Sequence, residues 1–109
     1  MHQIDIEPSL LPAILDSEKT IEICLGTPQH LKLRTGDVVS VAGAGAVFVK
    51  ITQLLYFETL AEALSTVDFE SVIPGAKTPD EALAIYHQRY SEADETEYGA
   101  MAITFKLDD

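Results

Sequence analysis

The sequence predicts a single α+β domain in which helices flank a small, mixed or antiparallel β-barrel. The chain has 109 residues, of which 47% are hydrophobic, so it is long enough to bury one core. Most strand-like segments are joined by turns and irregular loops, whereas a doubly wound sheet needs regularly alternating helices. Because no internal repeat, low-complexity tract or domain boundary is visible, we expect residues 1–109 to form one domain.

The N-terminal part is expected to contain two strands separated by a helix. Residues 2–6, HQIDI, alternate as in a short strand. Glu7-Pro8-Ser9 then begins a helix with an apolar stripe up to residue 15, because proline is tolerated in a first turn. Residues 16–18 end this helix, and residues 19–25 form the next strand.

The two faces of the strand at 19–25 differ in character. Successive side chains of a strand point to opposite faces, so the apolar residues Ile21, Ile23 and Leu25 share one face. The other face carries a hydroxyl, a carboxylate and the single thiol of the chain, from Thr20, Glu22 and Cys24. This polar face is either the wall of a ligand site or the solvated side of the strand.

The middle of the chain reads as turns and strands. Residues 26–29 and 34–37 have the composition of turns, and the second of them leads into a strand at 38–43. Gly43-Ala44-Gly45 is expected to be a hairpin tip, because it lacks the third glycine and following helix of a dinucleotide-binding loop. Residues 46–56, AVFVKITQLLY, form the longest strand-like segment.

The C-terminal part contains two helices and a closing strand. Thr59 and Glu62 form a capping box that begins the first helix, and Phe69 to Ile73 continue as a short helix or turn. Thr78-Pro79 begins the next helix, with acidic residues in its first turn. After the acidic run SEADETEYG, residues 100–107 alternate as a final strand.

Composition excludes several classes of partner. Eighteen acidic residues against seven Lys and Arg give a net charge of −11, which opposes binding along extended double-stranded DNA or other polyanions. No apolar run approaches the roughly 20 residues of a membrane helix, and the N-terminus lacks a signal-peptide pattern, so no membrane partner is expected. A single cysteine excludes an internal disulfide and fits the cytoplasm. The sequence has no metal-ligand spacing and predicts no metal or cofactor.

Five stretches together carry a resemblance to a known family: "EKTIEIC", "LKLRTGDVV", "YFETLAEAL", "VIPGAKTPDEALAIYHQRY" and "EYGAMAITFKL". In this order they resemble the ASCH domain, a small β-barrel related to the PUA domain. The resemblance covers residues 10–107. It implies a cleft beside the Lys-Thr-x-Glu strand that holds RNA or a nucleotide-like ligand.

The motif departs from the enzymes of that family. One bacterial branch hydrolyses acetylated cytidine and carries Lys-Thr-x-Thr-x-Arg, in which the Lys and the second Thr are catalytic. Lys19 and Thr20 match, but Glu22 and Cys24 occupy the positions of that Thr and the Arg. A carboxylate is not a hydroxyl nucleophile, so the amidohydrolase activity does not carry over. Other members have Lys-Thr-x-Glu-x-Arg, in which the Glu and Arg form a charge-assisted pair; Cys24 departs from this pattern too.

Lys19 and Glu22 are the principal candidate site residues. Lys19 is either a cation of the cleft or a solvated lysine at the start of a strand. Glu22 is flanked by isoleucines, so we expect it to be buried, and a buried carboxylate needs a partner. Candidate partners are Lys19, Lys32 and Arg34, and the alternative to a ligand site is a structural ion pair.

Several other side chains also have alternative roles. Arg34 faces either solvent or the cleft, and Asp37 is expected to accept backbone N–H bonds in its turn. Tyr86 and Tyr90 belong either to the core or to the border of the cleft. Cys24 would need His30 or His87 beside it to act as a nucleophile, so a buried and inert thiol is expected.

Three functional hypotheses follow. The first is a cytoplasmic ASCH-like protein that binds RNA or a nucleotide-like small molecule, with Lys19, Thr20, Glu22, Arg34 and Tyr86 as ligand-binding residues. The second is a hydrolase of a modified nucleoside or RNA, in which Glu22 is the general base and Lys19 the electrophile. The third is a protein-interaction module with a vestigial cleft. The sequence leaves the oligomeric state open.

Overall fold

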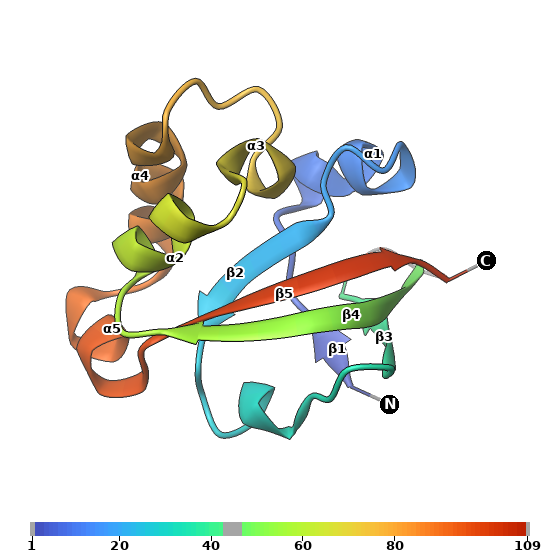
Figure 1. Ribbon diagram of the computed structural model, residues 1–109, viewed down its shortest axis with the longest axis horizontal. Helices are drawn as coiled ribbons and strands as arrows, with labels where there is room; N and C mark the ends of the chain where they lie inside the picture. Colours follow the sequence, from blue (N-terminus) through green and yellow to red (C-terminus); the bar gives the residue numbers. More distant parts are fainter. Residues whose placement is uncertain (1, 43–46, 109) are drawn as a thin grey trace.

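The computed structural model describes residues 2–42 and 47–108, which form an α+β domain around one five-stranded mixed sheet (Figure 1). The strands, in chain order, are β1 (Gln3–Ile4), β2 (Ile21–Leu25), β3 (Val38–Val41), β4 (Phe48–Phe57) and β5 (Ala100–Leu107). In space their order is β1-β3-β4-β5-β2. Strand β1 runs parallel to β3, and all other neighbours are antiparallel. The hairpin tip expected at Gly43-Ala44-Gly45 lies outside the described residues.

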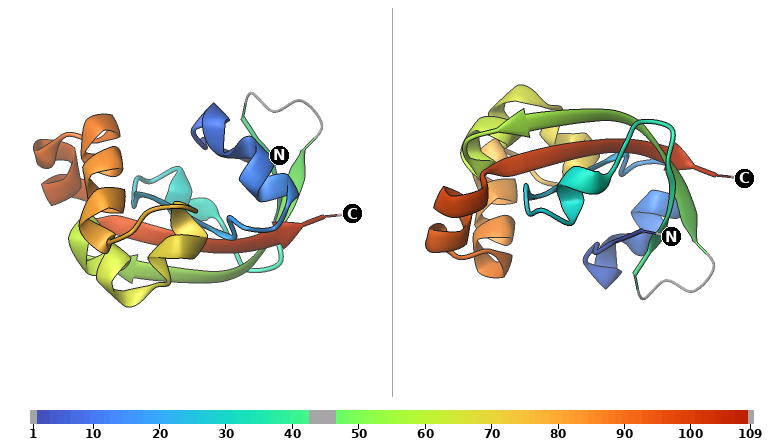
Figure 2. Two further views of the ribbon diagram at one scale, coloured as in Figure 1. Left: turned by 90° about the horizontal axis from the view of Figure 1, so that it is seen from above. Right: turned by 90° about the horizontal axis from the view of Figure 1, so that it is seen from below.

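Helices cover both faces of this sheet (Figure 2). The 3-10 helix η1 (Pro8–Leu10), helix α1 (Leu11–Leu15) and the 3-10 helix η2 (His30–Lys32) lie on one side. Helices α2 (Leu60–Thr66), α3 (Phe69–Val72) and α4 (Pro79–Arg89) pack on the other, and α5 (Glu92–Tyr98) follows them at the end of the sheet. Helix α5 was not expected, because its acidic sequence has no apolar stripe.

The core consists of two hydrophobic clusters, one on each face of the sheet. The first lies beneath η1 and α1: Ile4, Ile6, Ile14, Cys24, Leu33, Val39, Val41, Val49, Ile51, Met101, Ile103 and Phe105. The second lies beneath α2, α3 and α4: Ile21, Ile23, Leu25, Leu60, Ala63, Leu64, Val72, Ile73, Ala82, Tyr86, Ala100 and Ala102. The expected apolar face of β2 is therefore confirmed, but all five residues of β2 are buried, so its polar face is not solvated.

The α+β class is confirmed, whereas the sheet is not closed into a barrel. The strand order is linear, and β1 and β2 are its two edges. Closure would need hydrogen bonds between these edges, but β1 is only two residues long. Ile4 of β1 and Cys24 of β2 nevertheless join the same hydrophobic cluster, so the sheet curls its edges toward each other.

Side chains occupy the free edge of β2. The Lys19 Nζ donates to the carbonyl of Ile21 at 2.7 Å, and the N–H of Ile23 donates to Glu22 Oε1 at 3.1 Å. Further along, His30 Nδ1 contacts the carbonyl of Leu25 at 2.7 Å; since a carbonyl only accepts, Nδ1 carries the proton. These bonds use backbone groups that another strand would need for pairing, which is one way that native sheets protect an edge.

Capping residues fix the start of α4, the helix that approaches β2. The Thr78 Oγ1 accepts a hydrogen bond from the N–H of Glu81 at 3.2 Å, and Pro79 occupies the first helical position, as the sequence predicts. The expected start of α2 is confirmed in the same way, by a 3.0 Å bond from the N–H of Glu62 to Thr59 Oγ1. With its start fixed, α4 presents its C-terminal residues to the edge of the sheet.

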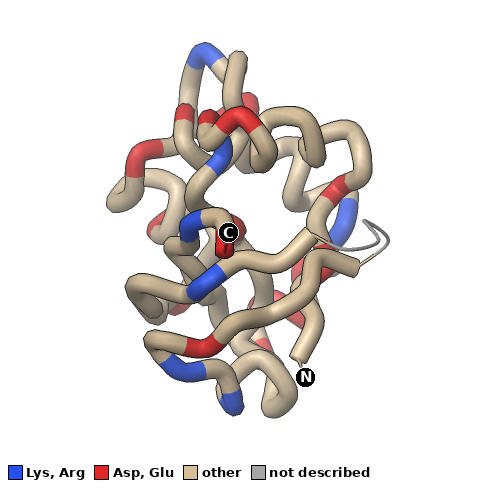
Figure 3. The backbone as a smooth tube through the Cα atoms, turned by 90° about the vertical axis from the view of Figure 1, so that its right-hand side faces the viewer, with Lys and Arg blue, Asp and Glu red and all other residues tan. Residues whose placement is uncertain are grey.

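The basic residues are scattered over the described part of the molecule and form no single cluster along its backbone. Figure 3 shows Lys and Arg at scattered points of the backbone, interspersed with the more numerous acidic residues. Among residues 2–42 and 47–108, no helix is both long enough and apolar enough to cross a membrane.

Candidate functional site

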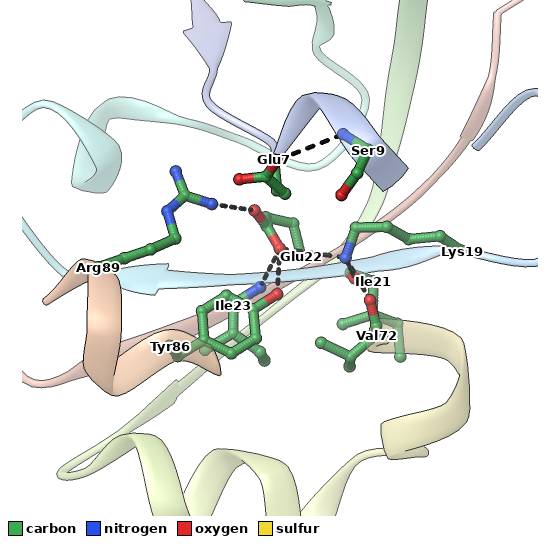
Figure 4. Close-up of polar contacts among 9 residues, drawn as sticks. All are labelled: Glu7, Ser9, Lys19, Ile21, Glu22, Ile23, Val72, Tyr86 and Arg89. Atoms are coloured by element: carbon green, nitrogen blue, oxygen red, sulfur yellow. Dashed lines mark hydrogen bonds and ion pairs between the residues drawn. The ribbon is translucent and has the colours of Figure 1, made fainter. Parts of the chain in front are cut away.

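Glu22, on the edge strand β2, is the centre of a buried polar cluster (Figure 4). Its Oε1 accepts three hydrogen bonds: from Lys19 Nζ at 3.1 Å, from the N–H of Ile23 at 3.1 Å and from the Tyr86 hydroxyl at 2.5 Å. Its Oε2 is buried and has no hydrogen-bond partner within the described part of the chain. The Arg89 guanidinium forms an ion pair with Oε2 across 3.7 Å, a distance too long for a hydrogen bond.

Lys19 holds Glu22 in place and has no donor to spare. Besides Glu22, its Nζ donates to the carbonyls of Ile21 at 2.7 Å and Val72 at 2.6 Å. These contacts use the three donors of an ammonium group. Only 1% of the residue is exposed. Burial lowers the pKa of Lys19, and the neighbouring Glu22 carboxylate opposes that shift. Lys19 is therefore a positioning residue whose charge is directed at Glu22.

Helix α4 supplies two further groups around Glu22. The Tyr86 ring is buried in the second hydrophobic cluster, and its hydroxyl reaches Glu22 Oε1. Burial, with a smaller contribution from the Glu22 charge, raises the pKa of Tyr86, so its hydroxyl remains a donor. Arg89 lies three residues further along and so shares a face of the helix with Tyr86. Helix α4 thus contacts both carboxylate oxygens of Glu22.

A cavity of about 180 Å³ adjoins this cluster. Its lining comes from the edge strand β1 and the residue after it, from β2, from β5, from η2 and from the end of α4: Ile4, Asp5, Glu22, Cys24, His30, Arg89, Tyr90 and Ile103. A cavity of about 150 Å³ in a protein interior is large enough for one benzene ring. The cavity therefore has room for a single six-membered ring.

The orientation of the Glu22 carboxylate relates it to this cavity. Lys19 and Tyr86, which bind Oε1, do not line the cavity, whereas Arg89, which faces Oε2, does. Of the two Glu22 oxygens, Oε2 is therefore the one that faces a residue of the cavity wall. This acceptor lies beside a donor, the Arg89 guanidinium.

The structure brings together three of the five ligand-binding residues predicted from the sequence. Glu22 lines the cavity, and Lys19 and Tyr86 bind Glu22 Oε1 without lining the cavity themselves. Thr20 directly precedes β2, and its N–H donates to the carbonyl of Ser71. Arg34 is exposed, and its guanidinium donates to the carbonyls of Leu31 and Leu33, so it does not reach Glu22.

The structure also shows the positions of the Asp37 carboxylate and the Cys24 thiol. The Asp37 carboxylate accepts the N–H of Arg34 at 2.9 Å, so its predicted role in the turn is confirmed. The Cys24 thiol is 4% exposed, and burial raises its pKa, which agrees with an inert thiol. His30 lines the same cavity as Cys24, but its Nδ1 is bonded to the carbonyl of Leu25.

Sequence reasoning missed Arg89, Asp5 and His30 as cavity residues. Arg89 had a detectable signal, because it follows Tyr86 by three residues on a strongly predicted helix. Asp5 and His30 are carried to the cavity by the curl of the sheet and by the loop after β2. No local pattern reports either of these.

A second, larger depression of about 620 Å³ lies against α5 and shares Tyr90 with the cavity. Its buried carboxylate, Glu95, already has partners: Oε2 accepts the N–H of Leu60 at 2.7 Å, and Oε1 lies 3.3 Å from His87 Nε2. Because these bonds explain Glu95 as a brace between α5 and α2, size alone does not make this depression the candidate site.

Replacing Lys19 tests its structural role. We expect Lys19→Met to lower the free energy of unfolding by about 3 kcal/mol, because removing one partner of a buried ion pair leaves the other uncompensated. Adding Glu22→Gln should restore part of that loss. Urea unfolding measures both, with the exposed Lys77→Met as control. Equal stability of the Lys19 and Lys77 variants would contradict the assigned role.

Tyr86→Phe tests the hydroxyl contact through its dependence on pH. Below pH 10 the variant should be less stable than the wild type by about 2 kcal/mol, the cost of losing a hydrogen bond to a charged group. Because the folded-state pKa of Tyr86 is raised above the ordinary 10.0, the wild type loses this advantage as the unfolded chain ionises above that pH.

The gap between the two proteins should therefore narrow as pH rises from 10 to 11. Urea unfolding at a series of pH values measures it, and Cys24 and Tyr90 cancel because both proteins contain them. Parallel stability curves across this range would refute the predicted coupling.

Comparison with known proteins shows the fold but no function. No family model and no curated protein matches the chain. The crystal structure of hypothetical protein PH0355 is similar over 97% of both chains, with a TM-score of 0.91 and 26% sequence identity. The solution NMR structure of protein PF0455 from Pyrococcus furiosus matches with a TM-score of 0.78 and 27% identity, over 97% of this chain and 96% of that one.

Proposed function

We propose that the protein binds a small nucleotide-like ligand, or the corresponding part of an RNA, in the cavity beside β2. The observation that carries this proposal is Glu22 Oε2, a buried acceptor without a hydrogen bond at the edge of a 180 Å³ cavity. Leaving such a group unpaired costs about 1–3 kcal/mol, and more when it is charged. A ligand N–H that donates to Oε2 removes this cost.

The form of the cavity supports a flat heterocycle. Its volume suits one ring, Tyr90 contributes an aromatic wall, and Arg89 contributes a cation. Single-stranded nucleic acids are recognised by stacking their bases on aromatic side chains and by hydrogen bonds to base edges. The net charge of −11 opposes contacts along an extended phosphate backbone, so binding is local.

We also propose that the chain is an ASCH-domain protein of the PUA-like superfamily, acting in the cytoplasm. The support is the Lys-Thr-x-Glu segment, in which Lys19 and Glu22 form one buried pair beside the cavity. On this proposal the curled sheet, whose edges β1 and β2 both line the cavity, corresponds to the small barrel of that family. The lone cysteine fits a reducing compartment.

Calorimetric titration against nucleosides, nucleotides and short RNAs tests the binding proposal. At least one of them should bind with a Kd below about 1 mM, and Glu22→Gln should weaken that binding at least tenfold, because the amide presents a donor as well as an acceptor. The exposed Glu62→Gln is the matched control and should bind like the wild type. The proposal fails if the native protein binds nothing in the panel up to millimolar concentrations.

A hydrolase is the second candidate, because Oε2 is free to take a proton from water. In that reaction the water oxygen attacks an acyl carbon, its proton passes to Oε2, and the acyl–nitrogen bond breaks as the leaving nitrogen takes a proton back. Arg89 replaces Lys19 as the cation near the reacting carbonyl, because the Lys19 donors are already bonded.

Acylated nucleosides test this second candidate. Incubation with the protein should release the free carboxylic acid, and Glu22→Gln should reduce the rate at least a hundredfold, the size of effect typical of general-base catalysis. Chromatography of the products measures the rate, with Glu62→Gln again as control. An unchanged rate in Glu22→Gln would remove Glu22 from the mechanism.

A further inference from the structure

We propose that the cavity recognises a neutral cyclic amide: a flat ring that presents an N–H donor directly beside a carbonyl acceptor. The N–H donates to Glu22 Oε2, and the carbonyl accepts from the Arg89 guanidinium. This inference deepens the proposed function and rests on it, because it names the part of a nucleotide-like ligand that enters the cavity. It makes Arg89 a specificity-determining residue.

The polarity of the two wall groups sets the polarity of the ligand edge. An ionised carboxylate only accepts hydrogen bonds, and a guanidinium only donates them. Three donors on Oε1 fix the Glu22 carboxylate, so it does not turn to offer a different atom. The ligand must therefore bring one donor and one acceptor, in neighbouring positions.

The distance between the wall groups suits an amide edge. Arg89 and Glu22 Oε2 form an ion pair across 3.7 Å but no hydrogen bond, so the donor and the acceptor are both available to a ligand. Standard bond lengths place the nitrogen and oxygen of an amide about 2.2 Å apart. Because the two wall atoms are farther apart than the two amide atoms, two hydrogen bonds of about 2.9 Å each diverge slightly from the amide edge to the wall. One amide edge thus satisfies both groups at once.

The same geometry disfavours an anion at the inner end of the cavity. A phosphate or carboxylate presents only acceptors there, and these would face Glu22 Oε2 and the nearby Asp5 at the cost of charge repulsion. The phosphate of a nucleotide therefore remains outside, and the base enters.

Arg89 is suited to this role because it is not part of the fold's buried hydrogen bonds. Its side chain is 28% exposed, and it lies over the Tyr90 ring, 5.7 Å from the ring centroid. The three hydrogen bonds that hold Glu22 come from other residues. Replacing Arg89 is thus expected to change recognition and leave the fold intact.

Two ring compounds that differ by one methyl group test the inference without a mutation. In an NMR titration of the ¹⁵N-labelled protein, 2-pyridone should shift the amide signals of cavity residues with a Kd in the millimolar range, as expected for a fragment of this size. N-methyl-2-pyridone keeps the carbonyl but lacks the N–H, and should bind at least tenfold more weakly. Inorganic phosphate should leave the signals of Glu22 and Cys24 unmoved.

Variants then assign the acceptor contact. Arg89→Met should weaken 2-pyridone binding at least fivefold, and its urea midpoint should fall less than that of Lys19→Met, because Arg89 is partly exposed and lies farther from Glu22 than Lys19 does. The exposed Lys77→Met makes the same change in charge and should bind like the wild type. Unchanged binding in Arg89→Met would overturn the role of Arg89.

The outcomes also separate this inference from the proposed function. Equal binding of the two pyridones, or displacement of 2-pyridone by phosphate, would overturn the amide edge. If nucleosides still bound in a manner dependent on Glu22, the proposed function would stand. Failure of nucleosides, RNAs and pyridones alike to bind would overturn both.

Discussion

The buried contact between Lys19 and Glu22, at 3.1 Å, is the interaction on which the arrangement of the domain depends. Through Lys19 it joins β2 to the carbonyl of Val72 in α3, and through Glu22 it joins β2 to Tyr86 in α4. The same two side chains occupy backbone groups on the outer edge of β2. One pair thus positions two helices, protects a sheet edge and orients the oxygen that borders the cavity.

Burying two charges is unfavourable unless their remaining donors and acceptors are satisfied. Here Lys19 Nζ and Glu22 Oε1 each take part in three hydrogen bonds, and only Glu22 Oε2 has none within the described residues. In native proteins, a buried polar group that lacks a hydrogen bond tends to occur at a functional site. The departure lies at the cavity, and Lys19, whose three donors are all used, keeps Oε2 there without binding a ligand itself.

Local signals in the sequence predicted much of the fold. Alternation placed Ile21, Ile23 and Leu25 in the core, and the capping threonines located the starts of α2 and α4. The prediction of a closed barrel was wrong because closure depends on hydrogen bonds between the two edge strands, and β1 is only two residues long. Strand periodicity also cannot reveal that the polar face of β2, whose Cys24 belongs to the first hydrophobic cluster, is buried as fully as the apolar face in the second.

The site was predictable only where its members are close in sequence. Lys19 and Glu22 are three residues apart, but the partnership of Glu22 with Arg89 depends on how α4 is rotated against the sheet. In the family that the sequence resembles, the arginine comes from the strand itself, at the position of Cys24. In this protein α4 brings the Arg89 guanidinium to 3.7 Å from Glu22 Oε2. On the proposed ASCH membership, Cys24 stands where other members carry an arginine, and Arg89 of α4 supplies the cation of the cavity in its place, so Cys24 does not argue that the cleft is vestigial.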